Sequence, residues 1–330
     1  MLAYIVRRAL LAILTIVAVS ILSFAIIQLP PGDYVTSYIA AQQASGNPLA
    51  QEAAENLRNL YGLDAPIYVQ YYKWVSQMAR GNFGQSMEWG RPVDQVIGDR
   101  LWLTVAISLT ALMFTWVVAL PIGIYSAVRQ YSVGDYVYTF LGFIGLAIPN
   151  FMLALILMYF GFKYFNLSIG GLFSPDYANA PWSPARLWDL VRHLPLPAVV
   201  LGLGGTAGII RIMRANLLDE LRKPYVVTAR AKGLPYMRAV LRYPVRVALN
   251  PFASTIGYEL PHIVSGSIIV SLVLSLPTVG PLLLRALISQ DMFLAGTIIL
   301  LLGTLTVIGT FLSDLLLMWI DPRIRLEDRP

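Results

Sequence analysis

The sequence predicts an all-α integral membrane protein with six transmembrane helices. Hydrophobic residues make up 57% of its 330 residues and charged residues only 13%, whereas soluble domains carry about 25% charged residues. The mean hydropathy of the whole chain is +0.65. A helix needs roughly 20 mostly apolar residues to cross a bilayer. Six stretches meet this requirement: 9–29, 101–128, 137–162, 194–213, 251–275 and 296–320.

The first stretch is expected to remain in the protein as a transmembrane helix. It follows Arg7 and Arg8 and is longer than the roughly 7–15-residue apolar core of a signal peptide. It ends in QLPPGDY, which offers no small-residue cleavage site. Residues 1–29 are therefore assigned to an N-terminal end and the first transmembrane helix.

Residues 30–100 form the second predicted region, an external segment that is too long for a turn. Within it, NPLAQEAAENLRNLYGL predicts an amphipathic helix between Pro48 and Gly62. IYVQYYKWVSQMARGNFG predicts an aromatic-rich helix or strand. Together they indicate a small external cap. A later external loop, 164–193, is rich in Pro and Trp, which fits either an interfacial anchor or a surface for a solute or partner.

Residues 101–330 are predicted to hold the other five transmembrane helices. The third and fourth stretches contain Pro and Gly, which membrane helices tolerate when neighbouring groups satisfy the freed backbone. Asn150, in AIPNF, interrupts the third stretch. GLGGTAG, from Gly202 to Gly208, lies inside the fourth stretch. Small residues there predict close helix packing rather than a nucleotide-binding loop.

Positive charges predict the orientation, because cytoplasmic loops carry an excess of Lys and Arg. Short basic segments occur at Arg7 and Arg8, at Arg129, between Arg211 and Arg246, and in the tail DPRIRLEDRP. With these segments inside, both termini are cytoplasmic. The net charge of +6 then reflects loops close to anionic lipid, and no nucleic-acid binding is expected.

Catalysis by this chain is not expected. It contains no cysteine and two histidines, so thiol chemistry and thiolate metal sites are excluded, and no metal site is predicted. The phosphate-cradling motif GxxxxGK[ST] is absent, so the chain should not hydrolyse ATP. No nucleophile–base arrangement is evident.

One short basic connection, within residues 214–250, predicts a defined helix. Arg230, Lys232, Arg238, Arg242 and Arg246 occur there with no acidic residue between them. Pro224 suits a first helical position and Gly233 a left-handed helix end, so a helix is expected over roughly 223–232. Pro235 then begins a second helix, and Pro244 kinks or ends it. A solvated basic loop would need only charge, whereas a framed helix suits a groove on a soluble partner.

The same residues resemble a known family. YVVTARAKGLP…RYPVRVALNP resembles the cytoplasmic EAA-type loop of permease subunits of binding-protein-dependent ABC importers. ARAKGL is similar to the dipeptide, oligopeptide and nickel branch, B-type subunit, a branch that also includes oligosaccharide importers. Further segments extend the resemblance over the whole chain. They are MLAYIVRRALLAI, QLPPGDY, LRNLYGLDAPIYVQYYKWV, GNFGQSM, the second stretch, SLPTVGPLLLRALISQDM and DPRIR.

The resemblance implies the type I permease architecture of ABC importers, with a cytoplasmic coupling helix. It further implies a bacterial or archaeal inner membrane, a second homologous permease, a periplasmic binding protein, and two cytoplasmic ATPase subunits that bind ATP and Mg²⁺ in place of this chain. By motif position, it assigns coupling to the ATPase to seven residues: Tyr225, Thr228, Ala229, Arg230, Lys232, Gly233 and Leu234.

Two departures from the family pattern affect these expectations. Val227 stands where the general loop pattern has an acidic residue, and Thr228 where it has alanine. In SLVLSLPTVG, Ser271, Leu274 and Thr278 replace the Glu, the Phe and one Gly that are typical of peptide permeases. The solute is therefore expected to be a di- or oligopeptide, with an oligosaccharide as the alternative.

Polar residues at membrane depth are candidates for the solute pathway or for structural contacts. The candidates for the pathway are Asn150, Glu259, His262 and Ser271. Asp314 is expected to pair with Arg211 or Arg214. A stand-alone secondary transporter is the alternative of a different class; it would need inverted repeats and broken helices with coupling charges, and no internal repeat is evident.

Overall fold

The computed structural model describes residues 2–28, 65–165, 170–252 and 267–320. Helices are the regular elements of these ranges, and one isolated bridge joins Gln85 and Pro92. The chain divides into two compact units. The first unit comprises Met1–Trp102 and Thr278–Ile308, and the second comprises Leu103–Pro277 and Gly309–Pro330.

Helix α1 (Leu2–Gln28) packs against α4 (Ile67–Ala79) in the first unit. The ring of Phe24 lies 5.4 Å from that of Tyr71 and 5.7 Å from that of Trp74, and Ser20 shares a 2.8 Å hydrogen bond with the Tyr71 hydroxyl. The aromatic segment that predicted a helix or a strand is thus a helix. The helix predicted between Pro48 and Gly62 lies outside the described residues.

A second apolar cluster of the first unit joins three helices. These are the start of α5 (Val93–Val128), α14 (Val279–Ile288) and the start of α15 (Met292–Ile320). Val93, Leu282 and Leu294 are each at most 2% exposed. This cluster holds the ends of the two long helices beside the short one.

Helix α9 (Pro195–Leu221) is the centre of the second unit. It contacts α6 (Val133–Ala147), α7 (Asn150–Phe165) and α8 (Pro184–His193) along its length. Three short helices follow it: α10 (Pro224–Ala231), α11 (Tyr236–Arg242) and α12 (Pro244–Ala248). α12 returns to pack on α9.

Four helices of the described residues are long and apolar enough to cross a membrane: α1, α5, α9 and α15. They correspond to the first, second, fourth and sixth predicted stretches. The stretch predicted over 137–162 is not one straight helix, because α6 and α7 meet at a bend of 102°. The fifth predicted stretch, 251–275, lies mostly outside the described residues, although residues 267–273 are helical.

The bend has a local cause. Ile148 has an extended backbone (φ −86°, ψ 122°), as expected for a residue before proline, where the α conformation is disfavoured. Pro149 also lacks the N–H that would continue the hydrogen bonds of α6. The interruption predicted at AIPNF is therefore confirmed, and it turns the chain sharply.

The glycines of α9 allow close helix packing, as predicted. A Cβ atom at Gly202 would lie 2.6 Å from Cδ1 of Phe114 and 2.9 Å from the carbonyl oxygen of Ala111. The hydroxyl of Thr115 donates a 3.0 Å hydrogen bond to the carbonyl of Gly202. α5 and α9 therefore approach at backbone distance, which only glycine permits.

We expect Gly202→Ala to destabilise the protein, because the added methyl group overlaps α5 and such overpacking costs about 1–3 kcal/mol. Gly208→Ala in the same helix is the matched control, since a Cβ there meets nothing within 4 Å. Thermal unfolding in detergent measures both. Equal effects of the two substitutions would contradict close packing at Gly202.

Candidate functional site

The backbone of α10 matches the frame predicted from its sequence. Pro224 occupies the first helical turn, and Gly233 has a φ of +86°. The N–H of Gly233 donates to the Arg230 carbonyl at 2.9 Å, and that of Leu234 to the Ala229 carbonyl at 3.2 Å. These two bonds form a Schellman motif, which satisfies the last carbonyls and ends the helix sharply.

The side chains of α10 separate into an inner and an outer face. Val226 and Ala229 are 3% and 8% exposed, and their i, i+3 spacing puts them on the same side of the helix. Leu234 is half-buried. Of the residues assigned to coupling, Ala229 thus faces inward, whereas five are exposed: Tyr225, Thr228, Arg230, Lys232 and Gly233.

Side-chain contacts hold α10 to its neighbours. The hydroxyl of Tyr225 donates a 2.5 Å hydrogen bond to the carboxylate of Glu220 near the end of α9. Partial burial and the Glu220 carboxylate raise the pKa of Tyr225, so its phenol keeps the proton that it donates. On the other side, the guanidinium of Arg230 lies 5.4 Å from the ring centre of Tyr236 on α11.

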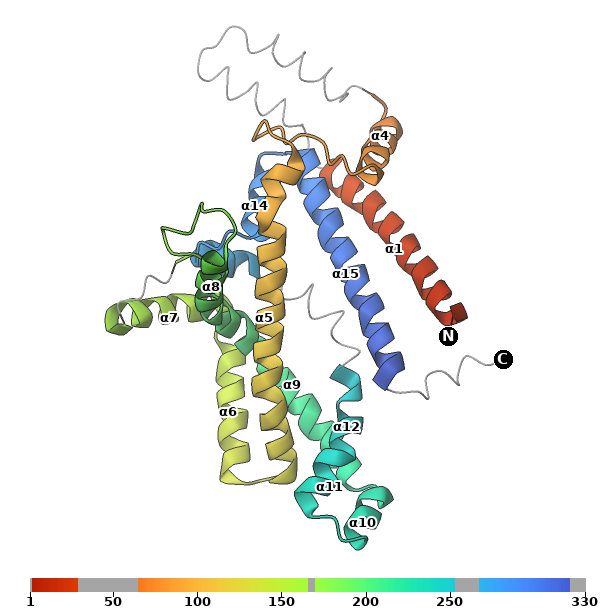
Figure 1. The fold of residues 1–330 in the computed structure, drawn as a ribbon, viewed down its shortest axis with the longest axis vertical. Helices are drawn as coiled ribbons and strands as arrows, with labels where there is room; N and C mark the ends of the chain where they lie inside the picture. The colour runs from red at the N-terminus through yellow and green to blue at the C-terminus, as the bar shows by residue number, and fades with distance from the viewer. Residues whose placement is uncertain (1, 29–64, 166–169, 253–266, 321–330) are drawn as a thin grey trace. The chain divides into compact units, whose positions relative to one another are not determined.

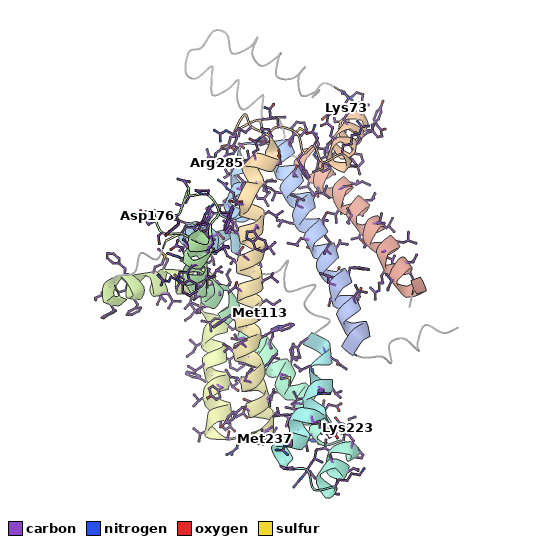
Figure 2. All side chains as sticks on the ribbon, in the orientation of Figure 1. Lys73, Met113, Asp176, Lys223, Met237 and Arg285 are labelled. Carbon is purple, nitrogen blue, oxygen red and sulfur yellow. The ribbon has the colours of Figure 1, made fainter. Side chains whose placement is uncertain are left out.

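Helices α11 and α12, which follow α10, pack against α9. Val240 and Val245 pack with Met213 and Leu217 of α9 in one buried cluster. Lys223, before α10, and Met237, on α11, are marked in Figure 2. Because α10 has partners on both sides, its outer face is presented by a supported helix and not by an open loop.

Tyr225→Phe should weaken the attachment of α10 without changing Pro224 and Gly233, the residues that define its two ends. A hydrogen bond to a charged group contributes about 1.5–3 kcal/mol, and less when it is exposed, so local opening should increase by up to about tenfold. Limited trypsin digestion after Arg230 and Lys232 measures this opening. Tyr236→Phe is the control and should leave the cleavage rate unchanged. If both variants are cleaved as slowly as wild type, the Glu220 contact does not hold α10.

An ion pair that the sequence did not reveal joins α6 to α9. The guanidinium of Arg214 binds Asp135 through Nε at 3.2 Å and Nη2 at 3.0 Å. Tyr131 also donates its backbone N–H to Asp135 at 2.9 Å, and Ser132 accepts from the Asp135 N–H. The observed partner of Arg214 is thus Asp135, and the expected pairing of Asp314 with Arg211 or Arg214 stays a prediction. The S-x-x-D pattern at the start of α6 was the signal that could have located Asp135.

Of the residues predicted for the solute pathway, the structure describes Asn150 and Ser271. Asn150 begins α7, and its amide oxygen lies against Gly204 of α9. Ser271 is 1% exposed, and its hydroxyl has no hydrogen-bond partner among the described residues. Glu259 and His262 lie outside the described residues.

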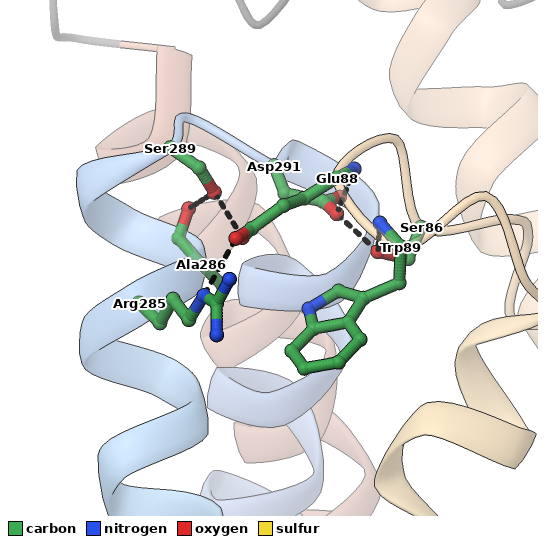
Figure 3. A network of polar contacts seen from close by, with 7 residues as sticks. All are labelled: Ser86, Glu88, Trp89, Arg285, Ala286, Ser289 and Asp291. Carbon is green, nitrogen blue, oxygen red and sulfur yellow. Dashed lines mark hydrogen bonds and ion pairs between the residues drawn. The ribbon is translucent and has the colours of Figure 1, made fainter.

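A second polar cluster lies in the first unit, where the loop before α5 meets the end of α14 (Figure 3). The Nε atom of Arg285 lies 2.6 Å from the Glu88 carboxylate, and its guanidinium stacks 4.8 Å from the ring centre of Trp89. Ser289 donates to the other oxygen of Glu88 at 2.8 Å. Arg285 remains exposed, so the cluster forms part of the surface.

Asp291 supports this cluster by binding the loop that carries Glu88. It is fully buried and accepts hydrogen bonds from the Ser86 hydroxyl and from the backbone N–H groups of Glu88 and Leu294. Burial raises the pKa of Asp291, and the hydrogen bonds from Ser86, Leu294 and Glu88 only partly oppose it. Because these three groups all donate to Asp291, its carboxyl acts as an acceptor of hydrogen bonds.

Because of this role, we expect Asp291→Asn to destabilise the protein less than Asp291→Ala. Asparagine keeps one acceptor oxygen, whereas alanine leaves buried donors unsatisfied at a cost of about 1–3 kcal/mol each. The unfolding temperatures of the two variants in detergent measure the difference. A greater loss for asparagine would show that the negative charge itself is required.

Four helices of the described residues are long and apolar enough to cross a membrane, so the fold is that of a multi-pass membrane protein. The structure is similar to a solved inward-facing form of the MetNI methionine ABC transporter, with a TM-score of 0.53 over 69% of this chain and 97% of that chain. The identity is 19%, so this similarity shows the fold alone.

The chain belongs to the family of binding-protein-dependent transport system inner membrane components. The model of that family matches residues 119–326, and the model of its N-terminal part matches residues 1–110. The oligopeptide transport system permease protein AppB of Bacillus subtilis is 35% identical, over 98% of this chain and 99% of that protein. The dipeptide transport system permease protein DppB of Escherichia coli is 31% identical, over 98% and 99%. The permease class predicted from the sequence is confirmed.

Proposed function

We propose that this chain is the permease subunit through which an ATP-driven importer moves di- or oligopeptides across the inner membrane of a bacterium or archaeon. A periplasmic binding protein delivers the peptide, and a second homologous permease completes the pathway. Two cytoplasmic ATPase subunits bind ATP and Mg²⁺, and this chain hydrolyses nothing. The observation that carries the proposal is α10, a capped and supported helix with an exposed basic face.

In this proposal, α10 is the coupling helix. Its exposed residues, among them Thr228, Arg230 and Lys232, enter a cleft on an ATPase subunit, while Val226 and Ala229 hold it to the permease. Closure of the two ATPases on ATP moves α10, and the Glu220–Tyr225 contact and the α11–α12 packing pass that movement to α9. α9 and its partners then tilt between inward-open and outward-open states.

The proposed topology has six transmembrane helices and both termini in the cytoplasm. The fifth helix crosses the membrane over 251–275, and α6 with α7 forms the bent third crossing. The Glu88–Arg285 cluster then lies on the external side, on the surface that the binding protein approaches.

Peptides are favoured over oligosaccharides for two reasons. The relatives above are named oligopeptide and dipeptide permeases and cover nearly the whole chain. The departures from the peptide-permease pattern are also buried: Ser271, Leu274 and Thr278 are each at most 2% exposed. These departures therefore affect internal packing and not a surface that contacts the solute.

A transport assay tests the proposal directly. The chain is reconstituted in proteoliposomes with its partner permease, ATPase subunits and binding protein, and the uptake of trialanine and of cellotriose is followed. We expect ATP-dependent uptake of trialanine alone. Uptake of cellotriose alone would assign oligosaccharides, and uptake driven by an ion gradient without the ATPases would indicate a secondary transporter.

Gly233→Val tests the coupling role of α10. A β-branched residue is strained at a φ of +86°, at roughly 1–2 kcal/mol, so the end of the helix should shift. We expect transport to fall by about tenfold while ATP hydrolysis by the complex continues.

Gly81→Val is the matched control, because Gly81 has a φ of +78° and, like Gly233, meets nothing within 4 Å of an added Cβ. It applies the same strain outside α10 and should leave transport intact. Normal transport by Gly233→Val would refute the coupling role.

A further inference from the structure

A small cavity lies between α6 and α9, beside the turn that joins α5 to α6. Its volume is about 220 Å³, and its lining includes Tyr131, Tyr138, Phe143, Arg211 and Arg214. Small-molecule sites usually measure about 300–1,000 Å³. The cavity is therefore too small for an oligomeric solute and suits one compact group.

The cavity has a positive charge that its own walls leave without an anion. Three charged residues line it: Asp135, Arg211 and Arg214. Asp135 and Arg214 form the ion pair described above. Arg211 is exposed, and its guanidinium lies 5.4 Å from the ring centre of Phe143. Among the described residues, no carboxylate forms a salt bridge with Arg211, so the cavity presents one net positive charge.

Arg211 is suited to an oxyanion of fixed geometry. A guanidinium offers two parallel N–H donors, which match the oxygens of a phosphate. Stacking on Phe143 holds the plane of this group in place. The arrangement thus favours a phosphate or phosphodiester over a neutral polar group.

The surroundings of the cavity are typical of a membrane–water boundary. It adjoins residues 129–132, which connect the apolar helices α5 and α6. Tyr131, Tyr136 and Tyr138 are 69%, 63% and 39% exposed around it. Exposed tyrosines at the ends of apolar helices are typical of the interfacial belt, where lipid headgroups lie. In the second unit, this turn lies at the same end as α10 and α11 (Figure 1).

We infer that this cavity binds the phosphodiester headgroup of an anionic phospholipid. Arg211 binds the phosphate, the tyrosines surround the glycerol region, and the acyl chains lie along the exposed apolar side of α6. Basic pockets between transmembrane helices bind anionic lipids in this way. Occupancy would fasten the cavity end of α6 to α9.

Native mass spectrometry of the assembled transporter, titrated with dioleoylphosphatidylglycerol and with dioleoylphosphatidylcholine, tests the inference. Wild type should bind phosphatidylglycerol at least about tenfold more tightly, and Arg211→Gln should remove this preference. Arg211→Lys should keep part of it. Arg222→Gln, which makes the same charge change at the end of α9 but outside the cavity lining, should bind like wild type.

Three outcomes would overturn the inference: equal binding of the two lipids by wild type, an unchanged preference in Arg211→Gln, and displacement of the lipid by an equal concentration of inorganic phosphate. The last would assign the site to a soluble anion. Should Arg211→Gln fail to assemble, Phe143→Leu provides the test, because it removes only the stacked ring. It should weaken phosphatidylglycerol binding by about threefold or more, and unchanged binding would contradict the inference.

Discussion

The hydrogen bond from Thr115 to the carbonyl of Gly202 exists because no side chain separates α5 from α9 at that point. Glycine lowers the stability of a helix by about 0.8–1.0 kcal/mol relative to alanine. At this position its missing side chain allows the two backbones to approach closely. The position of α9 then decides the positions of α6, α7, α8 and α12, which all contact it. The framed helix α10 follows directly from its end.

This arrangement would allow a short helix to transmit movement, as proposed for α10. A free eight-residue helix is too short to be stable in water. α10 is stabilised by its Schellman end, by the Glu220–Tyr225 hydrogen bond and by the packing of α11 and α12 on α9. A force on its outer face therefore reaches α9 through several contacts and not through a loop. In the proposed contact with an ATPase subunit, the basic charges would add affinity, whereas the hydrogen bonds and packing of α10 provide its stiffness.

Local features of the site were predictable from the sequence, whereas contacts between distant residues were not. Pro224 and Gly233 act through their own backbones, so the frame of α10 could be predicted without knowledge of its neighbours. Pro149 likewise predicted a break, but not an angle of 102°, which depends on what α7 packs against. The pairing of Arg214 with Asp135 depends on which helices lie side by side. The inward direction of Ala229 depends on the same tertiary contacts, because the motif alone does not say which face of α10 is buried.

The central claim is that the outer face of α10 contacts an ATPase subunit and moves with it. Val227 is 65% exposed on this face, so a photocrosslinking residue placed there samples the contact directly. In the assembled transporter, it should crosslink to the ATPase, with a yield that changes when ATP is added. The same group at Ile288, which is 75% exposed in the first unit, should not. Absence of crosslinking from position 227, or equal crosslinking to the ATPase from both positions, would contradict the account.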